Sequence, residues 1–151
     1  MSRVQLALRV ADLEGSIAFY SKLFGVEPAK RRPGYANFAI AEPPLKLVLL
    51  EGEEGEPTRM DHLGVEVEDT AQVTAATERL KEAGLATFEE NDTTCCYALQ
   101  DKVWVHGPGN EPWEVYVVKA DAGTLTKEAD SVCCTTGDAE KETVSAGKSC
   151  C

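Results

Sequence analysis

Two stretches of the chain carry the same pattern, and each holds a polar side chain that can bind a metal. Residues 5–12 are Gln-Leu-Ala-Leu-Arg-Val-Ala-Asp, and residues 62–69 are His-Leu-Gly-Val-Glu-Val-Glu-Asp. Apolar and polar residues alternate in both, which is the period of a half-buried β-strand. One constant spacing superimposes the two stretches and sets Gln5 opposite His62. We therefore interpret the chain as two copies of one module, with a metal-capable residue at the same place in each.

The last strand predicted for each module supplies a second pair of positions. Aligning Pro44 with Pro112 sets Lys46 opposite Glu114. Lysine cannot bind a metal while it is protonated, so Lys46 is not expected to be a ligand. Glu114 lies in an otherwise apolar stretch, where an unpaired carboxylate would be costly to bury. This cost favours a metal-binding role for Glu114.

Gln5, His62 and Glu114 together make a ligand set of one amide oxygen, one imidazole and one carboxylate. Such a set leaves about half of an octahedral shell open for substrate or dioxygen, and a related face of two histidines and one carboxylate is used by non-haem Fe(II) oxygenases. Each residue also has a simpler explanation, because a strand Gln is usually only polar and a lone strand His is more often hydrogen-bonded. Their correspondence through the repeat favours a metal site.

The pattern of the whole chain predicts an α+β fold of two tandem β-α-β-β-β modules that share one curved mixed β-sheet. Asp12 and Asp69 are suited to cap helices that end at Gly25 and Gly84. In the first module we expect strands at 4–10, 27–32, 35–40 and 45–50 and a helix at 13–24. In the second we expect a strand from residue 60, a helix at 70–83, strands at 86–90, 95–99, 103–106 and 113–118, a loop at 91–94 and a turn at 107–110.

The composition divides the chain into one domain and a tail. We expect a folded domain at 1–119, with module one at 1–51, a linker rich in Gly and Glu at 52–58 and module two at 59–119. After residue 119 the chain is dominated by Gly, Ala, Ser, Thr and charged residues. Such a segment cannot bury enough apolar surface to offset its ordering entropy, so 120–151 is predicted to be a disordered tail that contains cysteines.

The formal net charge of -11 disfavours nucleic acid and anionic membrane surfaces as partners, because both bind clustered Lys and Arg. No apolar run approaches the ~18 residues of a membrane span, and the start of the chain lacks the apolar block of a signal peptide. We therefore expect a cytoplasmic protein that acts on a small molecule, with no nucleic acid or membrane partner, as a monomer or a homodimer.

The six cysteines form three adjacent pairs, Cys95-Cys96, Cys133-Cys134 and Cys150-Cys151. A disulfide framework spreads its cysteines along the chain, and neighbouring cysteines close only a small strained ring. We therefore expect dithiols in a reducing cytoplasm. The two pairs in the predicted tail could capture thiophilic metals or metalloids, or they could have no role.

Three segments of the second module resemble a known family. Residues 91–98 (Asn-Asp-Thr-Thr-Cys-Cys-Tyr-Ala), 101–105 (Asp-Lys-Val-Trp-Val) and 111–116 (Glu-Pro-Trp-Glu-Val-Tyr), on the duplicated β-α-β-β-β plan, resemble the organoarsenical C–As lyases and the related cadmium-induced proteins. These belong to the vicinal oxygen chelate superfamily, with glyoxalase I, extradiol dioxygenases and antibiotic-resistance proteins. The resemblance covers about residues 1–119, and the Cys-Cys pair is its most specific part.

The resemblance implies an Fe(II)-dependent dioxygenase that cleaves the carbon–arsenic bond of methylarsonous acid and of reduced aromatic arsenicals and releases arsenite. Carried over by position, Gln5, His62 and Glu114 would bind iron, and Cys95 with Cys96 would be the catalytic pair that holds arsenic. Gln5 departs from the His that is more usual at the first-strand site of the superfamily's dioxygenases. A neutral amide oxygen is a weaker donor than imidazole.

The chemistry of the cysteine pair agrees with this implication. Trivalent arsenic is thiophilic, and a monoalkyl arsenical has two exchangeable oxygens, so two neighbouring thiolates can replace both. Adjacent side chains of a regular strand point to opposite faces, so Cys95 and Cys96 can share one arsenic only if the backbone forms a loop or a bulge there. The alternative is that both are small residues that fill an edge strand.

Further side chains have two possible roles. Tyr97 is a candidate substrate-binding residue and, with Trp104, Trp113 and Phe38, either lines the cavity or belongs to the core. His106 precedes a Gly-Pro-Gly turn, where it would act as an acid–base group at the site or face solvent.

Two classes of function remain open from the sequence. A metal triad beside an open site favours the lyase, whereas thiol pairs remote from the triad favour a protein that sequesters arsenicals or cadmium without turnover. A glyoxalase-like isomerase is disfavoured, because Lys46 stands where a fourth ligand would be expected.

Overall fold

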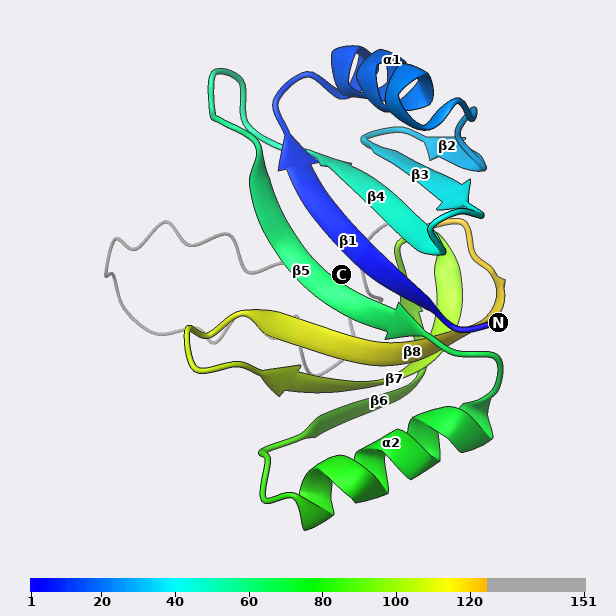
Figure 1. The fold of residues 1–151 in the computed structure, drawn as a ribbon, viewed down its shortest axis with the longest axis vertical. Coiled ribbons are helices and arrows are strands. Elements are labelled where there is room, and N and C mark those ends of the chain that lie inside the picture. The colour runs from blue at the N-terminus through cyan, green and yellow to red at the C-terminus, as the bar shows by residue number, and fades with distance from the viewer. Residues whose placement is uncertain (125–151) are drawn as a thin grey trace.

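The computed structural model describes residues 1–124, in which eight strands form one curved sheet and two helices pack against it (Figure 1). The elements of the first module are β1 (Arg3–Val10), α1 (Leu13–Phe24), β2 (Lys30–Arg32), β3 (Tyr35–Ile40) and β4 (Leu45–Glu51). Those of the second module are β5 (Arg59–Glu66), α2 (Thr70–Glu82), β6 (Phe88–Cys95), β7 (Ala98–His106) and β8 (Pro112–Asp121). The predicted α+β class and the repeated β-α-β-β-β order are confirmed.

The strand order places the two modules back to back around their first strands. The order is β2-β3-β4-β1-β5-β8-β7-β6, so β1 and β5 lie at the centre of the sheet. β1 pairs with β5 in the antiparallel sense, while β4 runs parallel to β1 and β8 runs parallel to β5. The strands predicted to carry the candidate ligands are therefore four neighbours, in the order β4-β1-β5-β8.

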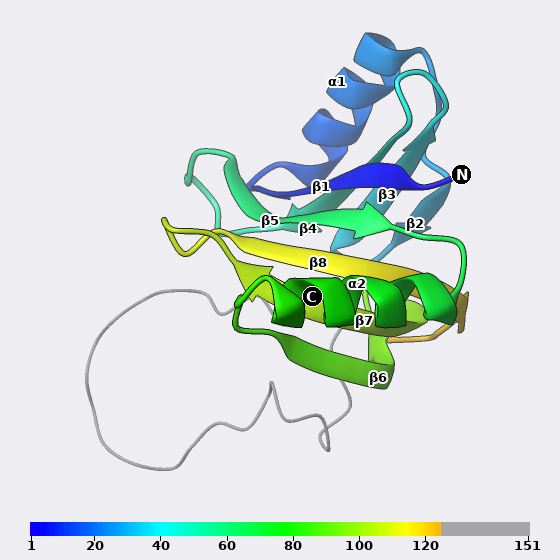
Figure 2. The same ribbon diagram turned by 60° about the horizontal axis from the view of Figure 1, so that its bottom comes forward.

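Each helix covers the strands of its own module, and the two helices lie at opposite ends of the sheet (Figures 1 and 2). Asp12 caps α1 by accepting a hydrogen bond from the Gly15 amide at 2.9 Å, and Asp69 caps α2 in the same way through the Gln72 amide at 2.8 Å. Gly25 adopts a left-handed φ of 66° at the end of α1, where a residue without Cβ is favoured. Both predicted helices are confirmed.

The alternation of side chains gives the two faces of the sheet different chemistry. On the helix side, apolar residues of β3 and β4 pack with Ile17 of α1, and Val103 of β7 and Val117 of β8 pack with Val73 of α2. On the opposite face the central strands carry buried polar residues instead. Burying so many polar groups is favourable only if they pair with one another or with a ligand.

The structure differs from the sequence prediction around residues 91–99. The predicted loop at 91–94 is wrong, because these residues continue β6 to Cys95, with a register shift between Glu90 and Thr93. Asp92 has a φ of 51°, and its amide donates to Asp101 Oδ1 at 2.8 Å. The residues with turn propensity thus form a β-bulge, and β6 continues past it because residues 93–95 pair with β7. The predicted strand at 95–99 is interrupted, because Cys96 and Tyr97 form the turn between β6 and β7.

The structure also describes the segment between the modules and the residues that follow 119. Residues 52–58 contain no helix or strand, and β8 extends two residues beyond residue 119. The Tyr97 amide donates to the Thr124 carbonyl, and the Ala122 amide donates to the Tyr97 carbonyl, both at 2.9 Å. The predicted disordered tail lies largely outside the described residues. Among residues 1–124, no helix is long and apolar enough to cross a membrane.

Truncation after Lys119 is expected to destabilise the domain more than truncation after Thr124 does. The shorter chain loses the pairing of residues 120 and 121 with β7 and both backbone hydrogen bonds to Tyr97, each worth about 1 kcal/mol. The melting temperature of the shorter chain is therefore expected to lie below that of the longer one by on the order of 5 °C or more. Equal melting temperatures for the two truncated proteins would contradict this role of residues 120–124.

Candidate functional site

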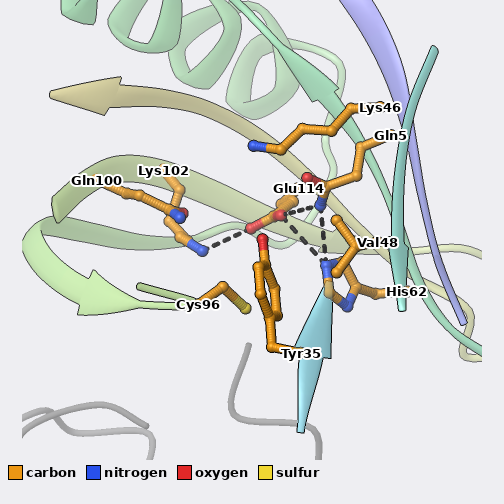
Figure 3. A pocket seen from close by; sticks show the side chains of 9 residues that line it. All are labelled: Gln5, Tyr35, Lys46, Val48, His62, Cys96, Gln100, Lys102 and Glu114. Carbon is orange, nitrogen blue, oxygen red and sulfur yellow. Dashed lines mark hydrogen bonds and ion pairs between the residues drawn. The ribbon is translucent and has the colours of Figure 1, made fainter. Parts of the chain in front are cut away.

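The four positions matched by the repeat meet in one cavity on the face opposite the helices (Figure 3). Gln5 comes from β1, Lys46 from β4, His62 from β5 and Glu114 from β8, and none of them is more than 9% exposed. Cys96, from the turn between β6 and β7, lines the same cavity. Tertiary structure thus brings together the predicted metal positions and one of the predicted thiols.

Three donor groups form a compact triangle in this cavity. Gln5 Nε2 lies 3.0 Å from His62 Nε2 and donates to Glu114 Oε1 at 2.7 Å, and His62 Nε2 lies 3.3 Å from Glu114 Oε1. Neighbouring ligands at ~2.1 Å from an octahedral cation are themselves about 3 Å apart. The cavity volume of about 10 Å³ is roughly that of one water-sized group. The spacing therefore fits a small divalent cation, provided that the amide presents its oxygen.

Only two of these three donors belong to the residue types that most often bind metals. Among residues 1–124, no three or more His, Cys, Asp and Glu side chains are grouped so as to hold a metal ion. The triangle reaches three donors only because Gln5 contributes an amide. An amide oxygen is a hard ligand suited to cations that also accept imidazole and carboxylate.

The ring of His62 is oriented by a neighbouring carboxylate. Its Nδ1 lies 2.7 Å from Asp61 Oδ2, and Arg9 Nε donates to Asp61 Oδ1 at 2.7 Å. Burial lowers the pKa of His62, but the bonds to Asp61 and Glu114 outweigh burial and raise it above the ordinary value. The raised pKa favours a proton on Nε2, so a cation that binds there must displace that proton, while Nδ1 keeps donating to Asp61, as in the usual metal-binding His.

The carboxylate of Glu114 is neutralised by a buried lysine. Lys102 Nζ lies 2.7 Å from Glu114 Oε2, and both side chains are almost completely buried. Burial raises the pKa of Glu114, but the charge of Lys102 and the contacts with His62 outweigh it and hold that pKa well below its ordinary value. Glu114 therefore remains ionised, with Oε1 left to face the triangle.

Lys46 points into the cavity, but it is paired with another carboxylate. Its Nζ lies 2.9 Å from Glu66 Oε2. Burial raises the pKa of Glu66, whereas Lys46, Tyr116 and Arg3 lower it, with a net shift below the ordinary value. Lys46 thus has an electrostatic role beside the triangle, consistent with its exclusion as a ligand.

The backbone at the cysteine pair brings the two sulfurs to the same side. Cys95 ends β6 and pairs with Ala98, while Cys96 and Tyr97 have φ values of 51° and 59°. Two consecutive positive φ values are typical of a two-residue type I′ hairpin turn. The sulfur atoms of Cys95 and Cys96 lie 3.6 Å apart. The turn thus departs from regular strand geometry. Cys95 is disulfide-bonded in the structure, and Cys96 is the free cysteine among residues 1–124, so the dithiol expected at this pair is wrong for this state.

The environment of Cys96 keeps its sulfur protonated at neutral pH. Burial raises the pKa of the Cys96 thiol to about 12, although the charges of Lys102 and Lys46 act in the opposite direction. The sulfur is therefore a neutral thiol in the closed cavity.

Tyr97 supports the cavity wall from behind rather than lining it. Its ring packs against Tyr35 at 5.3 Å between centroids, and its hydroxyl donates to the Pro33 carbonyl at 3.0 Å. Trp104 packs edge-on against His62 at 5.5 Å. None of Phe38, Tyr97, Trp104 and Trp113 is among the cavity-lining residues, and His106 is exposed at the end of β7.

Four lining residues were not predicted from the sequence: Tyr35, Val48, Gln100 and Lys102. Gln100 donates from Nε2 to the Cys95 carbonyl at 3.1 Å, so it holds the end of β6 in place. The sequence of β7 has three consecutive polar residues, Gln100, Asp101 and Lys102, so apolar–polar alternation does not single out the two that line the cavity. Tyr35 and Val48 carry no sequence signal either.

Comparison with known proteins places these features in a family context. Residues 3–115 match the Glyoxalase/Bleomycin resistance protein/Dioxygenase superfamily. Over all 151 residues and the full length of the relative, the chain is 72% identical to a protein from Thermomonospora curvata named trivalent organoarsenical cleaving enzyme. Over 125 residues, 83% of this chain and 82% of the relative, it is 65% identical to cadmium-induced protein CadI of Mycobacterium bovis.

Solved structures share the fold at lower sequence identity. The Mn(II)-bound glyoxalase from Novosphingobium aromaticivorans superimposes with a TM-score of 0.57 and 21% identity, covering 82% of this chain and 42% of that chain. At this identity the likeness concerns the fold alone.

A glycine allows two of the candidate ligands to approach each other. Gly64 of β5 is paired with Gln5 on one side and with Glu114 on the other. A Cβ atom at Gly64 would lie 3.0 Å from Glu114 Cγ and 3.4 Å from Gln5 Cβ. The space left by the missing side chain is therefore occupied by the stems of the two ligand candidates.

Gly64→Ala is expected to weaken divalent-cation binding about tenfold or more, because displaced ligands bind less well. Calorimetric titration with Mn(II) measures the effect. Gly52→Ala is the matched control, since a Cβ there meets no atom closer than 3.6 Å and lies in the linker. If Gly64→Ala bound Mn(II) as tightly as Gly52→Ala, the triangle would not be the cation site.

Proposed function

The chain belongs to the Glyoxalase/Bleomycin resistance protein/Dioxygenase superfamily, and from this premise we propose that it is an Fe(II)- and dioxygen-dependent enzyme that cleaves the carbon–arsenic bond of trivalent organoarsenicals. Methylarsonous acid and reduced aromatic arsenicals are the proposed substrates, and arsenite is the product. The observation that carries the proposal is that Cys96, whose sulfur lies 3.6 Å from that of Cys95, lines the same cavity as Gln5, His62 and Glu114. The name of the Thermomonospora curvata relative supports the same substrate class.

The two thiols hold the substrate through exchange of its hydroxyl groups. In the reduced protein, the sulfurs of Cys95 and Cys96 form two S–As bonds, two As–OH bonds break, and each thiol proton leaves with a hydroxyl as water. Arsenic remains trivalent, so this step needs no oxidant. The cavity has the volume of about one water-sized group, so neighbouring side chains must move when an arsenical binds. The carbon substituent would then project toward the triangle of donors.

The metal site is proposed at Gln5, His62 and Glu114, with Asp61 fixing the ring of His62 and Lys102 balancing the charge of Glu114. When bound, Fe(II) would supply open coordination positions at which dioxygen can be activated beside the held substrate. Tyr35 and Val48 line the same small cavity and limit the access of water. Tyr97 would contribute to substrate binding through Tyr35 and through the conformation of the turn.

Atom balance specifies the second product when no other reductant is present. Methylarsonous acid plus one dioxygen gives arsenous acid plus one formaldehyde, which balances carbon, hydrogen, oxygen and arsenic. The methyl carbon supplies the four electrons that dioxygen accepts, and the carbon–arsenic bond breaks while arsenic stays trivalent. Equal amounts of arsenite and formaldehyde therefore distinguish this reaction from simple release of a bound arsenical.

Arsenite and formaldehyde are expected in equal amounts only when Fe(II), dioxygen and methylarsonous acid are all present. The protein is reduced, freed of the reductant and loaded with Fe(II) without oxygen, and the products are then measured before and after oxygen is added. Arsenite release that persists without iron or without oxygen would contradict the proposal.

Cys96→Ser is expected to abolish turnover, because an alkoxide is a poor ligand for trivalent arsenic, while iron content stays at the level of the unchanged protein. The unchanged protein, reduced and loaded with iron in the same way, serves as the control. Activity in Cys96→Ser equal to that of the control would rule out the arsenic-binding role of Cys96.

The second candidate function is sequestration of arsenicals or cadmium through thiols without turnover. The 65% identity to the cadmium-induced protein CadI of Mycobacterium bovis supports this second candidate. The same assay separates the two functions. Tight binding of the arsenical without arsenite release, with Fe(II) and dioxygen both present, would support sequestration and reject the lyase.

A further inference from the structure

The hydroxyl group of Tyr116 stands between the proposed metal site and a buried ionic cluster. Tyr116 is fully buried, and its hydroxyl contacts Gln5 Oε1 on one side and Glu66 Oε2, at 2.8 Å, on the other. Both contacted atoms are hydrogen-bond acceptors. A phenol has one proton, so Tyr116 can donate to only one of them at a time.

The charge of Glu66 decides which acceptor receives the proton. Its carboxylate is held by Lys46 Nζ at 2.9 Å and by Arg3 Nη2 at 3.0 Å, and these two cations keep it ionised. A hydrogen bond to an ionised carboxylate is roughly twice as strong as one to a neutral amide oxygen. The Tyr116 proton therefore goes to Glu66, and the phenol oxygen is left to accept a hydrogen bond from Gln5.

Only one orientation of the Gln5 amide satisfies this requirement. The two ends of an amide are nearly equal in size, so a half-turn about the last side-chain bond exchanges oxygen and nitrogen without moving the group. With nitrogen toward Tyr116, the amide oxygen takes the place 2.7 Å from Glu114 Oε1 and 3.0 Å from His62 Nε2. This orientation presents an oxygen ligand to the centre of the triangle.

We propose that Tyr116 and Glu66 orient the amide of Gln5 so that its oxygen faces the metal, and thereby set the affinity of the site. The inference rests on the metal site of the proposed function and adds two positioning residues to it. Without a cation, the turned amide would set its oxygen against the carboxylate of Glu114, and the two acceptors repel. A divalent cation between them removes the repulsion, so the orientation that Tyr116 favours is the one that binds metal.

Removing the Tyr116 hydroxyl should reverse the preference of the amide. In Tyr116→Phe, nothing accepts from the amide nitrogen on the far side, so the nitrogen remains bonded to Glu114 as it is at 2.7 Å. Metal binding must then break that bond and leave a buried N–H group without a partner. Substitutions of groups that orient metal ligands commonly lower metal affinity ~10–100-fold.

The test is a double-mutant cycle that combines Tyr116→Phe with Gln5→Glu. A carboxylate presents an oxygen whichever way it turns, so its binding does not depend on being oriented. Tyr116→Phe is expected to weaken Co(II) and Mn(II) binding about tenfold or more in the Gln5 protein and less than about threefold in the Gln5→Glu protein. Calorimetry measures the affinities, and quenching of the fluorescence of Trp104 and Trp113 reports binding independently, because the Trp104 ring lies 5.5 Å from that of His62 and Trp113 adjoins Glu114.

Three outcomes overturn the inference, and one of them is shared with the proposed function. Unchanged affinity in Tyr116→Phe would show that the hydroxyl does not orient Gln5. If Tyr116→Phe weakened metal binding equally in the Gln5 and the Gln5→Glu proteins, Tyr116 would only support the fold. Tyr116→Phe would then lower the melting temperatures of both metal-free proteins by similar amounts. An unchanged protein that binds neither Co(II) nor Mn(II) would reject the metal site itself, and the proposed function with it.

Discussion

The carboxylate of Glu114 is buried, and the requirement that a buried charge be neutralised governs this side of the sheet. Lys102 contacts one oxygen, and Gln5 with His62 contacts the other. Removing one member of such a buried ion pair costs about 3–5 kcal/mol, because the remaining charge is left without compensation. The polar residues around Glu114 are therefore interdependent, and the same arrangement that stabilises the carboxylate leaves one of its oxygens directed at a gap of cation size.

The two modules share one polar site, because some of its buried charges are paired between them. Lys46 and Arg3 of the first module pair with Glu66 of the second, and Gln5 lies between Tyr116 and Glu114, which both come from the second. These contacts join residues of β1 and β4 in the first module to residues of β5 and β8 in the second. Duplication of a β-α-β-β-β unit thus produces a polar centre that exists only in the assembled sheet, as expected when a buried polar network must be fully satisfied.

The cysteine turn is held by elements from distant parts of the chain. Positive φ values at Cys96 and Tyr97 are unfavourable for residues with a side chain, and they persist because neighbouring groups fix them. Residues 122–124 bond the backbone of Tyr97, and the Lys30 ammonium and the Pro33 carbonyl hold it from the first module. The strained backbone is what turns two adjacent side chains toward one another, so the placement of the two sulfurs depends on β2, on Pro33 and on the residues that follow β8.

The sequence by itself determined both helices, most of the strands and the inward positions, because these follow from local periodicity and helix capping. The repeat identified Gln5 and His62, and the apolar surroundings of Glu114 identified the third donor. Only the tertiary structure decided the rest. Pairing with β7 made residues 91–94 a bulged strand rather than a loop, and strand order made Lys102 the counter-ion of Glu114. Strand order also places Tyr116 in contact with both Gln5 and Glu66. Sheet register and burial determine such contacts between residues far apart in sequence, and neither leaves a local signal in the chain.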